Sequence, residues 1–76
     1  MLFVPSDKVT SMKPFQERVV EEKKELDSKL NRLCAFFATT GFDRLDPAER
    51  ERLDRQAELM ERYSAVLKER IENFKE

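Results

Sequence analysis

The chain has 76 residues, 41% of them charged, and its 15 basic and 16 acidic residues leave a net charge of −1. This balance provides no global field to draw the protein onto a DNA or RNA polymer or an anionic membrane. One cysteine and no histidine exclude an internal disulfide and argue against a zinc site. We therefore expect no metal and no cofactor. A core of this size rarely contributes more than roughly 3 to 5 kcal/mol, which predicts self-association.

The N-terminal residues 1–11 hold only short apolar segments. The first, Met1 to Val4, stops at Pro5 and is far too short for a signal sequence or a membrane span. We expect an arm or a short helix here, no membrane partner and a cytoplasmic location. A single glycine and three prolines in the whole chain indicate long solvated helices, and hence an all-α fold.

A first long helix is predicted over about residues 12–40. It opens at Ser11 or Lys13, and Pro14 is tolerated because first-turn amides lack intrahelical partners. We expect Gly41 to end it as a left-handed cap, and Cys34 to be buried as a small hydrophobe. Its apolar stripe has three-and-four spacing and comprises Phe15, Val19, Leu26, Leu30, Leu33 and Phe37, with Glu22 at the missing step.

A second long helix is predicted over about residues 46–75. Asp46 is its N-cap, Pro47 takes the first helical position, and Glu49 stands where a reciprocal capping glutamate belongs. Its stripe comprises Leu53, Met60, Leu67 and Phe74 every seven residues, with Gln56, Ala57, Ser64 and Ile71 between them. Two long helices with a short connection should lie antiparallel. The sequence therefore predicts one helical domain, 1–76, built as a two-helix hairpin.

The second helix carries more apolar surface than one partner helix requires. Leu59, Tyr63 and Val66 fall on a flank beside the main stripe, and Arg52 and Arg70 project from the same flank. An aromatic ring and two guanidiniums beside aliphatic surface are typical of an interface. Packing alone would also explain Tyr63.

The first helix has a comparable cationic edge. Arg18, Lys29 and Arg32 lie along one line beside the main stripe, close to Phe36. The alternative is an ordinary charged surface, in which Arg18 pairs with Glu22 and Glu25 with Lys29.

The sequence lacks the residue patterns that catalysis needs. It has no histidine for proton transfer near neutral pH and no glycine-rich phosphate loop, and its carboxylates fall on solvated helix faces. No DNA-reading module is matched either. We therefore expect a binding protein rather than an enzyme.

Two stretches of the chain resemble a known family. The first is Phe15-Gln16-Glu17-Arg18-Val19-Val20-Glu21-Glu22-Lys23, continued by Leu26-Asp27-x-Lys29-Leu30. The second is Leu53-x-x-Gln56-x-x-x-Met60-x-x-Tyr63-Ser64-x-Val66-Leu67-x-x-Arg70-Ile71-x-x-Phe74. Together they resemble the phage anti-CBASS sponge family, and the resemblance covers most of residues 12–74.

The resemblance implies a short N-terminal helix followed by two long antiparallel helices, assembled as a homo-hexamer. It implies a protein that binds cyclic di- and trinucleotide immune messengers without cleaving them, in the host cytoplasm, and so blocks bacterial anti-phage signalling. Dinucleotides would lie where two protomers meet and trinucleotides where three meet.

Some site residues follow from the same resemblance. Lys29 matches the family's first-helix lysine for phosphate, and Arg70 matches its late arginine of the trinucleotide site. The family's N-terminal aromatic has only Phe15 or Phe3 as counterparts, because no tyrosine precedes Tyr63. With the cationic edge and the surplus flank, the candidate ligand-binding residues are Phe15, Arg18, Lys29, Tyr63 and Arg70.

Two other functions remain open at this point. The apolar flank could dock a helical adaptor or inhibitor onto a host protein, in a groove or as an added bundle helix. A purely structural phage component would have neither a nucleotide ligand nor a host partner.

Overall fold

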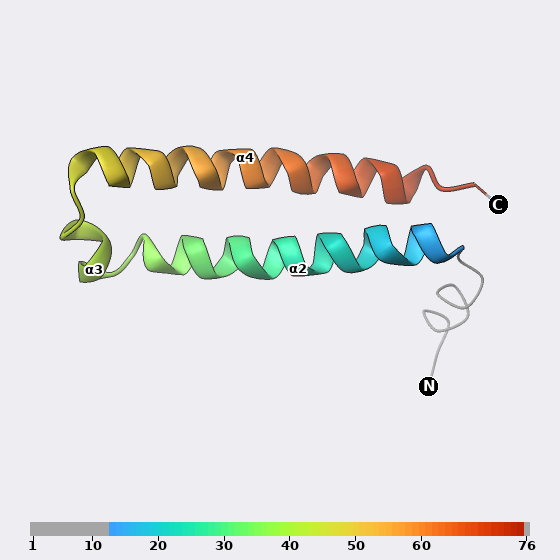
Figure 1. Cartoon of the computed structure of the whole chain (residues 1–76), viewed down its shortest axis with the longest axis horizontal. Coiled ribbons are helices and arrows are strands. Elements are labelled where there is room, and N and C mark those ends of the chain that lie inside the picture. The colour runs from blue at the N-terminus through green and yellow to red at the C-terminus, as the bar shows by residue number, and fades with distance from the viewer. Residues whose placement is uncertain (1–12, 76) are drawn as a thin grey trace, which may run out of the picture.

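The computed structural model describes residues 13–75, which form a long helical hairpin. Its helices are α2 (Pro14–Phe36), α3 (Thr40–Asp43) and α4 (Pro47–Glu72). Helices α2 and α4 lie side by side and antiparallel, with the short α3 at the closed end (Figure 1). No strand occurs within the described range, so the predicted all-α class and helix pair are confirmed. The arm predicted over residues 1–11 lies outside the described residues.

The open end of the hairpin is fastened by Gln16. Its Oε1 accepts a hydrogen bond from the Lys13 amide at 2.9 Å, and its Nε2 donates to the Lys75 carbonyl at 3.2 Å. Gln16 is buried as a result. The rings of Phe15 and Phe74 meet edge to face beside it, with centroids 5.9 Å apart. These contacts tie the start of α2 to the end of α4.

The closed end differs from the sequence prediction. Helix α2 ends at Phe36, and Thr39 starts α3 by accepting a hydrogen bond on its Oγ1 from the Phe42 amide. Gly41 therefore lies inside α3, and no described glycine has a positive φ. The predicted left-handed cap was wrong. A Cβ at position 41 would lie 3.3 Å from Phe36 Cε1, so the glycine allows close packing of that ring.

Helix α4 begins as predicted at Asp46. The carboxylate accepts a hydrogen bond from the Ala48 amide at 3.0 Å, and Pro47 takes the first helical position. Glu49 does not complete the reciprocal box, because its carboxylate accepts from Arg52 Nε at 2.9 Å instead.

The core is thin and uses only part of the two predicted stripes, because Phe15 and Gln56 are exposed. Leu67 is completely buried, and Val19 and Leu26 of α2 pack around it. Met60, Ile71 and Phe74 are partly buried against this cluster. Cys34 is exposed, so the prediction of a buried thiol was wrong. It follows Leu33 by one residue, and a step of about 100° around the helix carries it off the stripe.

A polar clasp interrupts the apolar contact between the helices. Asp27 accepts hydrogen bonds from Lys23 Nζ at 2.7 Å and from Ser64 Oγ at 2.5 Å, and Lys23 Nζ lies 3.0 Å from the same Ser64 oxygen. The bond from Lys23, followed by that from Ser64, lowers the pKa of the Asp27 carboxyl below its ordinary value. The three groups satisfy one another and fix the register of α2 against α4.

Candidate functional site

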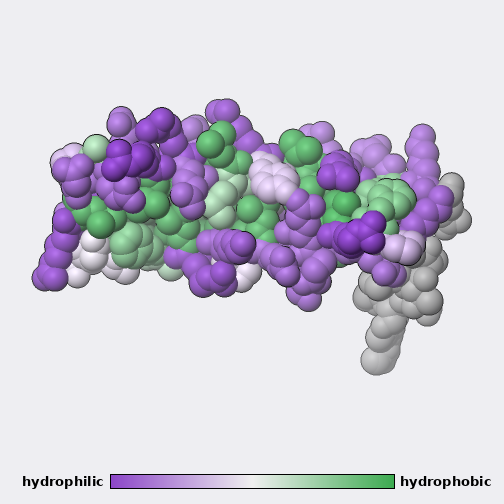
Figure 2. Space-filling model, viewed as in Figure 1, coloured by the Kyte–Doolittle hydropathy of each residue, from purple (hydrophilic) through white to green (hydrophobic). Residues whose placement is uncertain are grey.

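The flank of α4 beside the face that packs on α2 is exposed. The exposed fractions of Leu59, Tyr63 and Val66 are 62%, 44% and 52%. Arg52 and Arg70 are exposed on the same flank. Hydrophobic side chains reach the molecular surface between charged ones, as Figure 2 shows. A single chain thus leaves this apolar flank uncovered.

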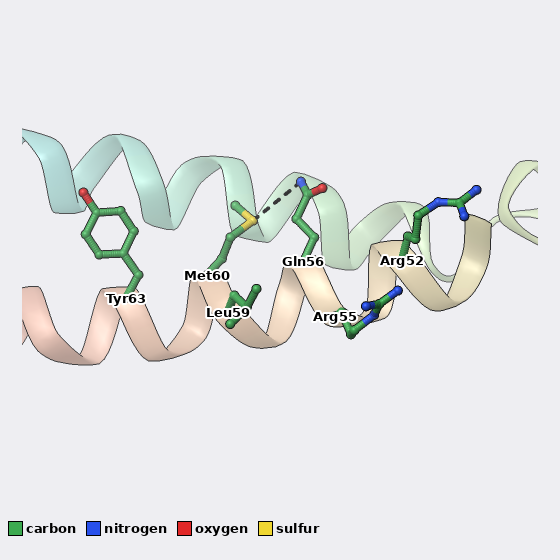
Figure 3. A pocket seen from close by; sticks show the side chains of 6 residues that line it. All are labelled: Arg52, Arg55, Gln56, Leu59, Met60 and Tyr63. Atoms are coloured by element: carbon green, nitrogen blue, oxygen red, sulfur yellow. Dashed lines mark hydrogen bonds between the residues drawn. The ribbon is translucent and has the colours of Figure 1, made fainter. Parts of the chain in front are cut away.

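A surface hollow of about 500 Å³ opens on this flank. All of its lining residues come from three turns of α4, namely Arg52, Arg55, Gln56, Leu59, Met60 and Tyr63. In Figure 3 the Tyr63 ring stands at one end of the hollow and the two arginines at the other. The hollow is wide open to solvent, because only one helix lines it. The hollow is cationic at one end, apolar in the middle and aromatic at the far end.

Hydrogen-bond donors remain available inside the hollow. Glu49 occupies the Nε of Arg52, which leaves the two terminal guanidinium nitrogens. Arg55 makes no side-chain hydrogen bond or ion pair with residues 13–75. The only partner of the Gln56 amide among them is the Met60 sulfur, at 3.9 Å. The hollow can therefore receive an anionic group without breaking an existing ion pair.

One hairpin does not gather the five predicted ligand-binding residues into one pocket. Tyr63 lines the hollow, whereas Arg70 lies two turns further along, about 10 Å away on the helix axis. On α2, Arg18 and Lys29 are exposed and lie about 16 Å apart along the axis. Phe15 packs against Phe74 with its ring half exposed. Phe3 lies outside the described residues.

The cationic edge of α2 does not form the ion pairs that an ordinary charged surface would favour. Within residues 13–75, no ion pair joins Arg18 to Glu22 or Glu25 to Lys29. Arg32 instead donates to the Ser28 hydroxyl at 2.8 Å. Within residues 13–75, Arg18 and Lys29 thus have no ion-pair partner.

Of the six lining residues, sequence reasoning predicted only Tyr63 as a ligand-binding residue. It placed Arg52 and Leu59 on the flank and gave Arg55, Gln56 and Met60 no place in a site. Gln56 and Met60 belong to the predicted core stripe, and Arg55 resembles any solvated arginine. The spacing of four lining residues indicated a shared face. Gln56, Leu59 and Tyr63 follow Arg52 at three- and four-residue steps.

Two other kinds of site are not found in the described part of the chain. No group of three or more acidic, cysteine or histidine side chains there is placed to hold a metal ion. None of the described helices combines the length and the apolar character needed to cross a membrane.

Comparison with known proteins gives one family. A family model described as Sequestin matches residues 13–73, which span α2, α3 and α4 together. No curated protein and no solved structure matches the chain. Because the match extends over most of its length, the chain belongs to the Sequestin family.

Proposed function

We propose that this protein sequesters cyclic di- or trinucleotide messengers without cleaving them, and so blocks bacterial anti-phage signalling in the host cytoplasm. The family name supports the general part of this proposal, because it denotes sequestration. The resemblance to the phage sponge proteins supplies the ligand class. No catalytic step is part of the proposal.

The observation that carries the proposal is the composition of the exposed flank of α4. An aromatic ring that is 44% exposed lies in the same hollow as two arginines. A cyclic oligonucleotide needs cations for its phosphates and flat side chains for its bases, and one base stack contributes about 1 to 3 kcal/mol. Arg18 and Lys29 on α2, which form no ion pair with residues 13–75, add to the same complementarity.

Self-assembly is part of the proposed mechanism. Only Leu67 is fully buried among the described side chains, so one hairpin has a small core for its length. The five candidate residues are also spread along the hairpin. A symmetric oligomer, a hexamer by the resemblance, would repeat these side chains around each axis and complete pockets that one chain leaves open.

Titration calorimetry with a panel of cyclic di- and trinucleotides tests this function. We expect tight binding to at least one member, and recovery of the intact ring after the protein is denatured. A null result across the panel would refute the proposal, and a linear product would refute sequestration without cleavage.

A second candidate is a helical adaptor or inhibitor that binds a host protein. The exposed Leu59, Tyr63 and Val66 side chains favour it, because apolar residues that share one exposed flank can form a patch for docking. A host protein that competes with self-association, together with no nucleotide affinity, would support this candidate over the first.

A further inference from the structure

The lining of the hollow changes character along the axis of α4. Its N-terminal end holds Arg52 and Arg55, its middle holds Leu59 and Met60, and its C-terminal end holds Tyr63. Arg55 and Tyr63 are eight residues apart, which is about 12 Å of helix. In Figure 3 both arginine side chains extend away from Tyr63. They are long and exposed, so rotation about their side-chain bonds can bring the guanidiniums closer to the ring and fit a small elongated ligand.

The chemical groups of a nucleotide follow the same order as the groups that line the hollow. Its phosphate is a compact anion that guanidinium groups bind through charge-assisted hydrogen bonds. Its base is flat and stacks on an aromatic ring whatever its sequence identity, because every base has a π-face. The sugar between them would lie over the apolar middle of the hollow, within reach of the Gln56 amide.

We infer that the hollow binds one nucleotide unit, with its phosphate against the Arg52 and Arg55 guanidiniums and its base against the Tyr63 ring. This inference takes its ligand class from the proposed function. It adds a half-site that lies within each chain and involves none of the other predicted ligand residues, Phe15, Arg18, Lys29 and Arg70. A cyclic oligonucleotide would then occupy one such half-site for each chain that it contacts.

Tyr63 provides a direct readout of this half-site. It is the only tyrosine of the chain, which has no tryptophan, so fluorescence excited at wavelengths that phenylalanine does not absorb reports on this ring alone. The probes are adenosine 5′-monophosphate and, as a phosphate without a base, ribose 5-phosphate. We expect the first to shorten the fluorescence lifetime of Tyr63. The second should compete with it and leave the lifetime unchanged.

A pair of arginine variants tests the phosphate contact. Arg55→Gln should raise the nucleotide concentration needed for half-maximal quenching by roughly tenfold or more, since it removes a charged hydrogen-bond donor. Arg62→Gln is the matched control, because Arg62 lies outside the hollow and is paired with Glu58 at 3.6 Å. It should bind as the wild type does, and helix content by circular dichroism should be unchanged in both variants.

Three results would overturn the half-site. The nucleotide could leave the Tyr63 lifetime unchanged, or both arginine variants could weaken binding equally. Self-association could instead change the lifetime and abolish its response to the nucleotide, which would show that a second copy covers the hollow. If calorimetry still detected binding of a cyclic oligonucleotide in any of these cases, only the half-site would be refuted, and the proposed function would remain supported. Quenching by the mononucleotide without affinity for any cyclic ligand would support the half-site and refute the proposed function.

Discussion

Two faces of α4 carry apolar residues at helical spacing, but one is buried and the other is exposed. The inward face, with Ala57, Met60 and Leu67, is buried or partly buried against α2. Leu59 and Val66 each precede an inward residue by one position, so the outward face that they form with Tyr63 is turned by about 100° from the inward face, and it stays exposed. Periodicity therefore identifies which residues share a face. Burial depends on which of these faces packs against another helix. The outward face is where arginines and the aromatic ring accumulate.

The largest expected effect concerns the inward face. Leu67→Ala should lower the free energy of unfolding by about 3 kcal/mol, because it removes the one fully buried side chain of the described range and leaves a cavity. Leu59→Ala on the outward face should change it by less than about 0.5 kcal/mol in dilute monomer. Urea unfolding monitored by circular dichroism measures both. Equal losses would remove the distinction between the faces.

The next effect concerns ligand binding by the outward face. Arg70→Gln should leave monomer stability nearly unchanged and weaken binding of the cyclic ligand by about tenfold or more, as expected for loss of a charged hydrogen bond. Lys29→Gln on α2 should behave in the same way. Titration calorimetry measures the affinity, with Arg62→Gln as the control. A variant that loses stability along with affinity would indicate a structural role instead.

A smaller effect is expected from the clasp at the edge of the inward face. Ser64→Ala should lower the free energy of unfolding by about 1 kcal/mol, since it removes hydrogen bonds to Asp27 and Lys23. The effect is limited because the Asp27 side chain is 42% exposed. Urea unfolding at neutral pH gives the value.

The clasp also predicts a pH dependence. The pKa of Asp27 is lower in the folded chain than its ordinary value of 3.8, so its contribution to stability is present above that value. The contribution is lost as the pH falls through the lowered pKa. The stability difference between the wild type and Asp27→Asn should therefore shrink in acid. A difference independent of pH would show that the carboxylate charge contributes nothing.

The smallest effect is expected away from both faces, at the closed end. Gly41→Ala should change the free energy of unfolding by less than about 1 kcal/mol, because the helical backbone accepts alanine and only the Phe36 ring must shift. Thermal unfolding gives the comparison. A loss of unfolding free energy well above that value would indicate that Gly41 needs a left-handed backbone, which the structure excludes.

Helix identity and the core stripe could be predicted from the sequence because both depend on local spacing and caps. Asp46 and Pro47 set the start of α4 through contacts within one turn. Gly41 was misread because Thr39 restarts the helix, and a glycine needed for close packing resembles one needed for a turn. The clasp joins Asp27 to Ser64 across 37 positions, and no local pattern indicates such a pair.

The candidate site was less predictable than the fold. Tyr63 stood out as an aromatic residue on the flank, and Arg52 was placed on the same flank but not among the ligand-binding residues. The sequence does not distinguish Arg55 from the other exposed arginines. Only the structure shows that it lines the same hollow as Leu59 and Tyr63. A shared surface depends on three-dimensional neighbours, which composition and spacing do not determine.

Native mass spectrometry of the protein with its cyclic ligand tests the central claim most directly. We predict a homo-oligomer whose mass is a multiple of the 9.1 kDa chain, with intact cyclic oligonucleotides bound in a fixed ratio to the subunits. A 9.1 kDa species without ligand, or release of a linear nucleotide, would contradict sequestration by an assembled, non-catalytic protein.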